Sequence, residues 1–155
     1  MSGIVLPEDI AAERWIRLDR SLRAPTERVF RVWSDPEELP RWLPDKLEGS
    51  LAVGSRSTLL WRRQRVWWDV TAAEPNSRFA GRMPWLPDDG LVTTFTVGIE
   101  PEGYGTRLHF ENGPFHIDEP GVFDAWERAL EAWVEALAML RAFVDFSTDL
   151  RLQRY

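Results

Sequence analysis

The residue types that carry most enzymatic and metal chemistry are scarce in this chain. Its 155 residues include two histidines and no cysteine, which excludes thiolate catalysis, disulfides and cysteine-ligated metals. His116 stands in the loop 114–120 with Asp118 and Glu119, a grouping that could hold a divalent cation. No helical or strand repeat fixes its geometry, so we interpret it as a solvated loop and predict no metal and no cofactor. His109 alternates with apolar strand residues, which predicts an outward side chain.

The motifs that organise common catalytic sites are also missing from the sequence. There is no Gly-x-Ser-x-Gly nucleophile turn and no glycine-rich phosphate loop. The few serine, histidine and aspartate residues leave a catalytic triad open. We name no catalytic residue, and the sequence favours a protein that is not an enzyme.

Arg20 is the charged residue of greatest interest, because it interrupts an apolar series. Strand alternation places it on the same face as Leu18 and Leu22. A buried guanidinium is costly unless it is paired. Arg20 could therefore anchor the carboxylate of a ligand, pair with Glu127 or Glu131, or reach water near a strand end.

Aromatic residues dominate the predicted interior. The chain has nine tryptophans and eight phenylalanines, and large rings leave larger gaps between them than aliphatic side chains do. The interior is therefore either an aromatic-lined pocket or a tightly packed core. The predicted ligand-binding residues are Arg20, Trp61, Phe79, Phe95, Phe110, Trp126, Leu130 and Trp133.

The elements that must position these residues follow from periodicity and turn signals. Apolar alternation predicts a first strand over 14–23, a short helix from Pro25 and a second helix from Asp35 to Trp42. Short strands separated by turn residues come next and predict a curved antiparallel sheet. These predicted strands are 47–53, 55–62, 65–74, 78–83, 91–100 and 106–112. A long helix over 121–146 follows, with an apolar stripe formed by Phe123, Trp126, Leu130, Trp133, Leu137, Leu140 and Val144.

Composition and charge narrow the partners and the compartment. The formal net charge of −6 disfavours a nucleic-acid partner. The N-terminus lacks a signal peptide, and no stretch approaches the ~18 apolar residues of a membrane helix, so we expect a cytoplasmic protein with no membrane partner. Residues 1–13 are predicted to be an N-terminal tail and residues 14–150 a single domain. Trp85 lies in a loop that we expect to be exposed, as a pocket lid or as a contact for a protein partner or a second copy.

The segment from Ala24 to Pro44 carries a family pattern. It combines an Ala-Pro pair, a short amphipathic helix, Asp-Pro-Glu at 35–37 and a late Trp42, with Val29-Phe30 where Val-Trp is usual. This pattern resembles the START-like, or SRPBCC, superfamily, and within it the branch related to the C-terminal domain of the heat-shock ATPase activator. The resemblance implies an α+β helix-grip fold of the birch-pollen-allergen type. In that fold the sheet wraps around the last helix and a cavity lies between them.

Three functions are compatible with this resemblance. The first, which we favour, is a carrier or sensor that binds a small hydrophobic or aromatic molecule in the cavity. The second is an enzyme of the polyketide cyclase or aromatase kind, which needs polar groups placed in the pocket for acid–base work. The inward positions that we can name are nearly all apolar, so two or more buried, close polar groups would be needed to favour it. The third is a protein-interaction module, by analogy with the co-chaperone domain.

Overall fold

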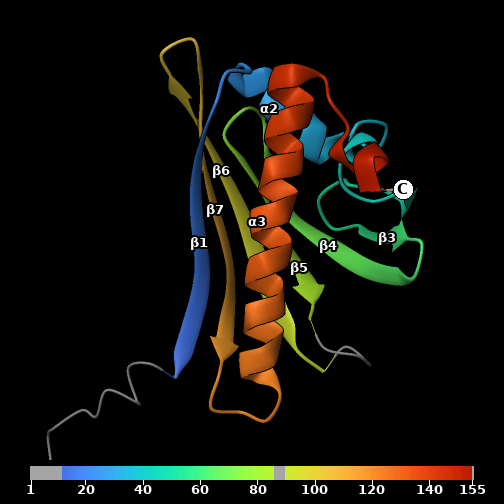
Figure 1. Ribbon diagram of the computed structural model, residues 1–155, viewed down its shortest axis with the longest axis vertical. Helices are drawn as coiled ribbons and strands as arrows, with labels where there is room; N and C mark the ends of the chain where they lie inside the picture. Colours follow the sequence, from blue (N-terminus) through green and yellow to red (C-terminus); the bar gives the residue numbers. More distant parts are fainter. Residues whose placement is uncertain (1–11, 86–89, 155) are drawn as a thin grey trace, which may run out of the picture.

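The computed structural model describes residues 12–85 and 90–154. They form a curved, seven-stranded antiparallel sheet with a long helix lying across one face (Figure 1). The strands are β1 (Glu13–Leu22), β2 (Lys46–Gly49), β3 (Arg56–Trp61), β4 (Gln64–Glu74), β5 (Arg78–Pro84), β6 (Val92–Glu102) and β7 (Gly105–His116). The helices are α2 (Thr26–Ser34), α3 (Val122–Phe146) and the 3-10 helices η1 (Leu39–Arg41) and η3 (Leu150–Arg154). The predicted α+β helix-grip fold is confirmed.

The sheet brings the first and last strands together. Its order is β1-β7-β6-β5-β4-β3-β2, so β1 and β2 form the two edges. The pairing register shifts between Arg14 and Ile16 in β1 and between Val70 and Ala72 in β4. Such bulges bend a strand and increase its twist. The sheet therefore curves, and its inner face is covered by α2 over β5, β6 and β7 and by α3 over β1 and β7.

Helix α3 runs without a glycine or proline between Val122 and Phe146, as the sequence predicts. It ends where Ser147 adopts a left-handed conformation and the Thr148 N–H donates to the Ala142 carbonyl. The carboxylate of Asp145 accepts hydrogen bonds from the backbone N–H groups of the two residues that follow β1. This contact fixes the end of α3 against the edge strand.

The buried stripe of α3 is rotated from the predicted one. Trp133, Leu137 and Leu140 are buried as predicted, but Phe123 is 47% exposed whereas Ala125 and Ala129 are fully buried. Small residues let a helix approach a sheet closely, and the large ring of Phe123 is left outside that contact. The buried α3 residues are Val122, Ala125, Ala129, Trp133, Ala136, Leu137, Met139, Leu140 and Phe143.

The short elements also differ from prediction at their ends. Asp35 accepts a hydrogen bond from the Glu37 N–H, as a capping residue does, but a turn and η1 follow instead of a second α-helix. Strand β2 stops at Gly49, whose φ of +96° ends the extended run before the predicted limit. Strand β7 continues to His116, past the predicted end.

Two sequence predictions concern the chain's ends and its contact with membranes. The predicted tail, residues 1–13, lies almost entirely outside the described residues, and Glu13 already begins β1. Within 12–85 and 90–154, no helix combines the length and the apolar character needed to cross a bilayer.

Candidate functional site

The interior between the sheet and α3 is built around the ring of Trp133. Its centroid lies 4.3 Å from that of Phe110 on β7, and 6.4 Å from those of Phe95 on β6 and Trp33 on α2. Trp33 is held in turn by an edge-to-face contact with Trp42 at 4.9 Å. Elements far apart in the sequence thus meet at one aromatic cluster.

The cluster extends across the sheet through β4 and β5. Trp68 lies 4.6 Å from Phe95, and Phe79 lies 6.3 Å from Trp68 and 6.1 Å from Phe95. Gly81 makes this packing possible, because a Cβ there would stand 2.9 Å from the Phe95 ring and 2.7 Å from the Asp69 carbonyl oxygen. Trp67, the neighbour of Trp68, lies on the opposite face of β4, as the alternation predicts.

A buried polar group, Asn112, stands inside this aromatic environment. Its amide oxygen accepts hydrogen bonds from Trp85 Nε1 at 2.8 Å and from Trp133 Nε1 at 3.1 Å. Its amide nitrogen donates to Thr93 Oγ1 at 2.9 Å and to the Thr94 carbonyl at 2.7 Å. Asn112 and Thr93 are both buried. The amide therefore joins β7, β6, α3 and Trp85, the residue that follows β5, in one hydrogen-bond network.

Sequence reasoning did not single out Asn112, although a signal was present. Residue 112 continues the i, i+2 series of the inward residues Leu108 and Phe110. A polar residue that continues an apolar face is a candidate for a buried hydrogen-bond centre. The prediction stopped the strand at 112 and gave its last residue no role.

Within 12–85 and 90–154, four buried donor groups in or beside the core have no hydrogen-bond partner. They are the indole Nε1 atoms of Trp33, Trp68 and Trp126 and the hydroxyl of Ser57. Ser57 and Trp68 stand opposite one another in the β3–β4 pair, and both residues are about 1% exposed. The indole of Trp42 differs, because its Nε1 donates to the Val32 carbonyl. Unpartnered buried donors are uncommon in folded proteins.

The structure brings together part of the predicted ligand-binding set. Phe79, Phe95, Phe110 and Trp133 share the aromatic cluster. Three others, Trp61, Trp126 and Leu130, are half-buried and pack against the edge of the core. Trp61 Nε1 donates to the Leu43 carbonyl at 3.0 Å, and the Trp126 ring lies 5.9 Å from that of Phe123.

Arg20 lies apart from the aromatic cluster. It is on the face of β1 that includes Leu18 and Leu22, as predicted, but it lines a groove against the C-terminal half of α3. Its Nη1 donates to the carbonyl of Asp19 at 2.8 Å. The structure shows no ion pair between Arg20 and either of the two α3 glutamates proposed as partners, Glu127 and Glu131.

The expectation that Trp85 is exposed is wrong. Its ring is half-buried and lies 6.3 Å from that of Trp133 and 6.5 Å from that of Phe115. The hydrogen bond to Asn112 draws the indole inward. The rest of the predicted lid, residues 86–89, lies outside the described residues.

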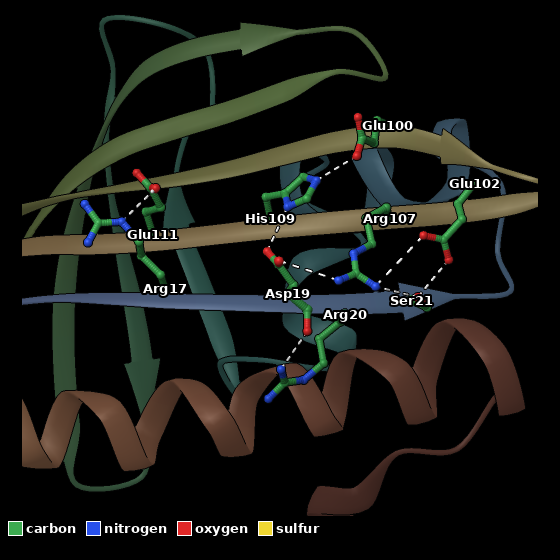
Figure 2. Close-up of polar contacts among 9 residues, drawn as sticks. All are labelled: Arg17, Asp19, Arg20, Ser21, Glu100, Glu102, Arg107, His109 and Glu111. Carbon is green, nitrogen blue, oxygen red and sulfur yellow. Dashed lines mark hydrogen bonds and ion pairs between the residues drawn. The ribbon is translucent and has the colours of Figure 1, made fainter.

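The outer face of the sheet carries a charged network centred on His109 (Figure 2). His109 points outward, as predicted, with Nδ1 2.7 Å from Asp19 Oδ1 and Nε2 2.8 Å from Glu100 Oε1. These hydrogen bonds, that to Glu100 first, raise the pKa of His109, and the bond from His109 lowers the pKa of the Asp19 carboxyl. Arg107 adds ion pairs to Asp19 and Glu102. Among the described residues, no group of three or more His, Asp or Glu side chains is arranged so that it could hold a metal ion.

Comparison with known structures supports the fold. The chain is similar to protein MLL2253 from Mesorhizobium loti, with 24% identity and a TM-score of 0.76 over 87% of this chain and 99% of that chain. CalU16 from Micromonospora echinospora aligns with 22% identity and a TM-score of 0.69, over 85% of this chain and 76% of its own. The Aha1 dimer from Colwellia psychrerythraea aligns with 19% identity and a TM-score of 0.73, over 85% and 96%. These low identities show a shared fold only.

Comparison with family models assigns most of the chain to a family, whereas comparison with curated proteins does not. No curated protein is significantly similar to the chain. The family model described as "Activator of Hsp90 ATPase homolog 1-like protein" matches residues 23–145. This span begins just before the Ala-Pro pair and ends in the last turn of α3, so it includes the elements that build the aromatic interior. The chain therefore belongs to the Activator of Hsp90 ATPase homolog 1-like family.

Proposed function

We propose that the chain binds a small aromatic molecule with oxygen acceptors between the sheet and α3. The observation that carries this proposal is the set of buried, unpartnered donors, chiefly Trp33 Nε1, Trp68 Nε1 and Ser57 Oγ. An indole N–H can only donate a hydrogen bond, so its missing partner must be an acceptor. Leaving such a group unpaired in the interior costs about 1–3 kcal/mol. A ligand carbonyl or phenolic oxygen would recover part of that cost.

The positions of the donors indicate where the ligand oxygens would lie. Ser57 and Trp68 are directly paired across β3 and β4, which puts their Cβ atoms about 4.5–5.5 Å apart. Paired residues point to the same face of the sheet, so ligand acceptors on that face would lie on the side of both groups. Trp33 is linked to this pair through the cluster, since its ring neighbours that of Trp133, Trp133 neighbours Phe95, and Phe95 neighbours Trp68. A ligand that accepts hydrogen bonds both from Trp33 and from the Ser57–Trp68 pair would be planar and would carry an acceptor oxygen for each.

The proposed walls are the apolar side chains predicted from the sequence. They are Trp61, Phe79, Phe95, Phe110, Trp126, Leu130 and Trp133. Several of these rings are in contact, such as Phe110 and Trp133 at 4.3 Å. A ligand would therefore enter by separating rings, and it would change the environment of several indoles at once. Arg20 was also predicted to bind the ligand. It would not touch a ligand among these rings, because the groove that it lines lies outside the aromatic cluster.

A fluorescence titration with paired compounds tests this function. The panel would hold oxygenated planar compounds, such as hydroxylated anthraquinones, and the matching hydrocarbons. We expect the oxygenated members to change the tryptophan emission saturably. The change Trp68→Phe keeps an aromatic ring and removes the N–H, so it should weaken binding about fivefold, the value of one neutral hydrogen bond.

The matched control is Trp67→Phe, on the opposite face of the same strand. It removes an indole outside the interior, so the affinity should not change. If neither class of compound binds, or if the two variants weaken binding equally, the proposal is wrong. A lack of any ligand would favour the third hypothesis, a protein-interaction module, whose partner or second copy would then be sought by sedimentation.

The second candidate, an enzyme of the cyclase or aromatase kind, is favoured by one observation. Asn112 and Thr93 are two buried polar side chains 2.9 Å apart in the same interior. An amide and a hydroxyl do not titrate near neutral pH, so they could not act as the base. They could orient a carbonyl substrate only by giving up a hydrogen bond that they make within the protein. Incubation with a linear polyketone, followed by mass spectrometry, tests this function. Loss of water that depends on Asn112 would support it, and an unchanged substrate would contradict it.

A further inference from the structure

A groove of about 370 Å³ lies between the edge strand β1 and the C-terminal half of α3, away from the aromatic interior. Figure 2 shows Arg20 extending from β1 toward α3. The groove is lined by Arg20, Val134, Leu137, Ala138, Arg141, Ala142 and Phe146. Its volume is within the range of small-molecule sites, which starts near 300 Å³.

The shape of the groove follows from the spacing of residues along α3. Val134, Ala138, Ala142 and Phe146 succeed one another at intervals of four, so they lie on one face of the helix. The two alanines leave a hollow between the larger side chains at each end. Both large side chains are exposed, Val134 at 43% and Phe146 at 53%. The run spans about 18 Å at 1.5 Å per residue.

The charges in the groove are of one sign. Its lining contains two arginines and no carboxylate, on a chain whose formal net charge is −6. Arg20 donates to a neutral carbonyl, that of Asp19. Arg141 stands 4.0 Å from Asp145, whose carboxylate already accepts from the backbone N–H groups of Arg23 and Ala24. The two guanidinium groups therefore keep the capacity to bind an anion.

We propose that this groove binds a monomeric amphiphilic carboxylate, a molecule with one apolar chain and one carboxylate. The carboxylate would lie between Arg20 and Arg141, because a guanidinium matches the two oxygens of a carboxylate. The apolar chain would lie along Ala138 and Ala142 and cover the exposed side of Phe146. Charge complementarity selects this occupant over a neutral or cationic amphiphile of the same length. The site is independent of the proposed aromatic ligand.

Binding of decanoate, followed by calorimetry and by NMR shifts of the backbone amides, tests the proposal. We expect shifts concentrated over residues 134–146 and along β1. Decyltrimethylammonium, which has the same chain and the opposite charge, should bind at least about tenfold more weakly. Arg20→Met keeps an apolar stem and removes the charge, so it should weaken decanoate binding about tenfold.

Two further variants separate the groove from general effects. Ala138→Phe fills the hollow at an exposed position and should abolish binding without unfolding the chain. Arg63→Met removes an exposed arginine in the turn between β3 and β4 and should leave the affinity unchanged. Equal binding of the carboxylate and the ammonium, or equal effects of Arg20→Met and Arg63→Met, would overturn the proposal. Shifts confined to the tryptophan indoles would also overturn it, because they would place decanoate in the interior.

Two other occupants are distinguished by the same variants. If the chain binds phosphatidylglycerol vesicles through Arg20 but does not bind monomeric decanoate, the groove recognises a lipid surface and the proposal is wrong. If Ala138→Phe converts a dimer into a monomer in sedimentation velocity, the groove is an interface between copies and the proposal is again wrong.

Discussion

Asn112 should be the polar residue on which the stability of the interior depends most. Replacing it with leucine keeps a similar volume but removes four hydrogen bonds, two accepted from indoles and two donated by the amide. Trp133 Nε1 would then be left unpaired in a buried place, at a cost of about 1–3 kcal/mol. The half-buried Trp85 indole could instead turn to water. We add about 0.5–1.5 kcal/mol for each of the other bonds and subtract about 1–2 kcal/mol for the better burial of leucine.

At their central values these contributions give a net loss of about 3–4 kcal/mol of the free energy of unfolding. In a urea titration followed by circular dichroism, a slope near 2 kcal/mol per molar would convert this loss to a midpoint about 1–2 M lower. The control is Glu111→Gln, the preceding residue on the outer face, whose ion pair with Arg17 is exposed on both sides. It should change stability by less than about 0.5 kcal/mol. If Asn112→Leu costs no more than this control, the amide is not the centre of the network and the interior is organised by ring packing alone.

Three other perturbations have directions that the structure determines. Trp133→Ala should cost about 3–5 kcal/mol in the same titration, because it empties the centre of the aromatic cluster; a loss below about 1 kcal/mol would mean that the cluster closes around the gap. Gly81→Ala should destabilise the chain and change its near-ultraviolet circular dichroism, because its Cβ would meet an aromatic ring at 2.9 Å; an unchanged spectrum would contradict the close packing. The raised pKa of His109 predicts that its contacts with Asp19 and Glu100 stabilise the fold fully below about pH 6.5, and that this contribution disappears as the pH rises through the folded pKa. His109→Asn should therefore lower the unfolding midpoint more at about pH 5.5 than at about pH 8.5. The difference should be small, because the side chains are solvent-exposed. A larger effect at the higher pH would mean that the pKa of His109 is not raised in the folded protein.

Much of the fold could be predicted from local pattern. Alternation in β7 placed His109 on the outer face, and alternation in β4 put Trp67 and Trp68 on opposite faces. The uninterrupted α3 followed from the absence of glycine and proline over 25 residues. These properties depend on contacts within a few residues, which is why a sequence pattern contains them.

The candidate site was predicted only in part, because its hydrogen bonds join residues that are far apart in the sequence. Trp85 and Asn112 are 27 positions apart, and Trp133 and Asn112 are 21 apart. Periodicity places each of these residues on a face but does not show which residues of other elements will meet it. The expected exposure of Trp85 was wrong for this reason, since a loop tryptophan looks solvent-facing until its hydrogen-bond acceptor is known.

The sequence alone determined the order of the strands and of the long last helix, the inner faces of β6 and β7, and the aromatic character of the interior. Tertiary structure decided the rotation of α3, which buries Ala125 and Ala129 and leaves Phe123 outside. It also decided that Arg20 faces a groove beside α3 while Trp133 turns from α3 toward the ring of Phe95 on the sheet. The physical reason is that strand alternation has only two outcomes, whereas the rotation of a helix is set by how closely its small residues can approach the sheet.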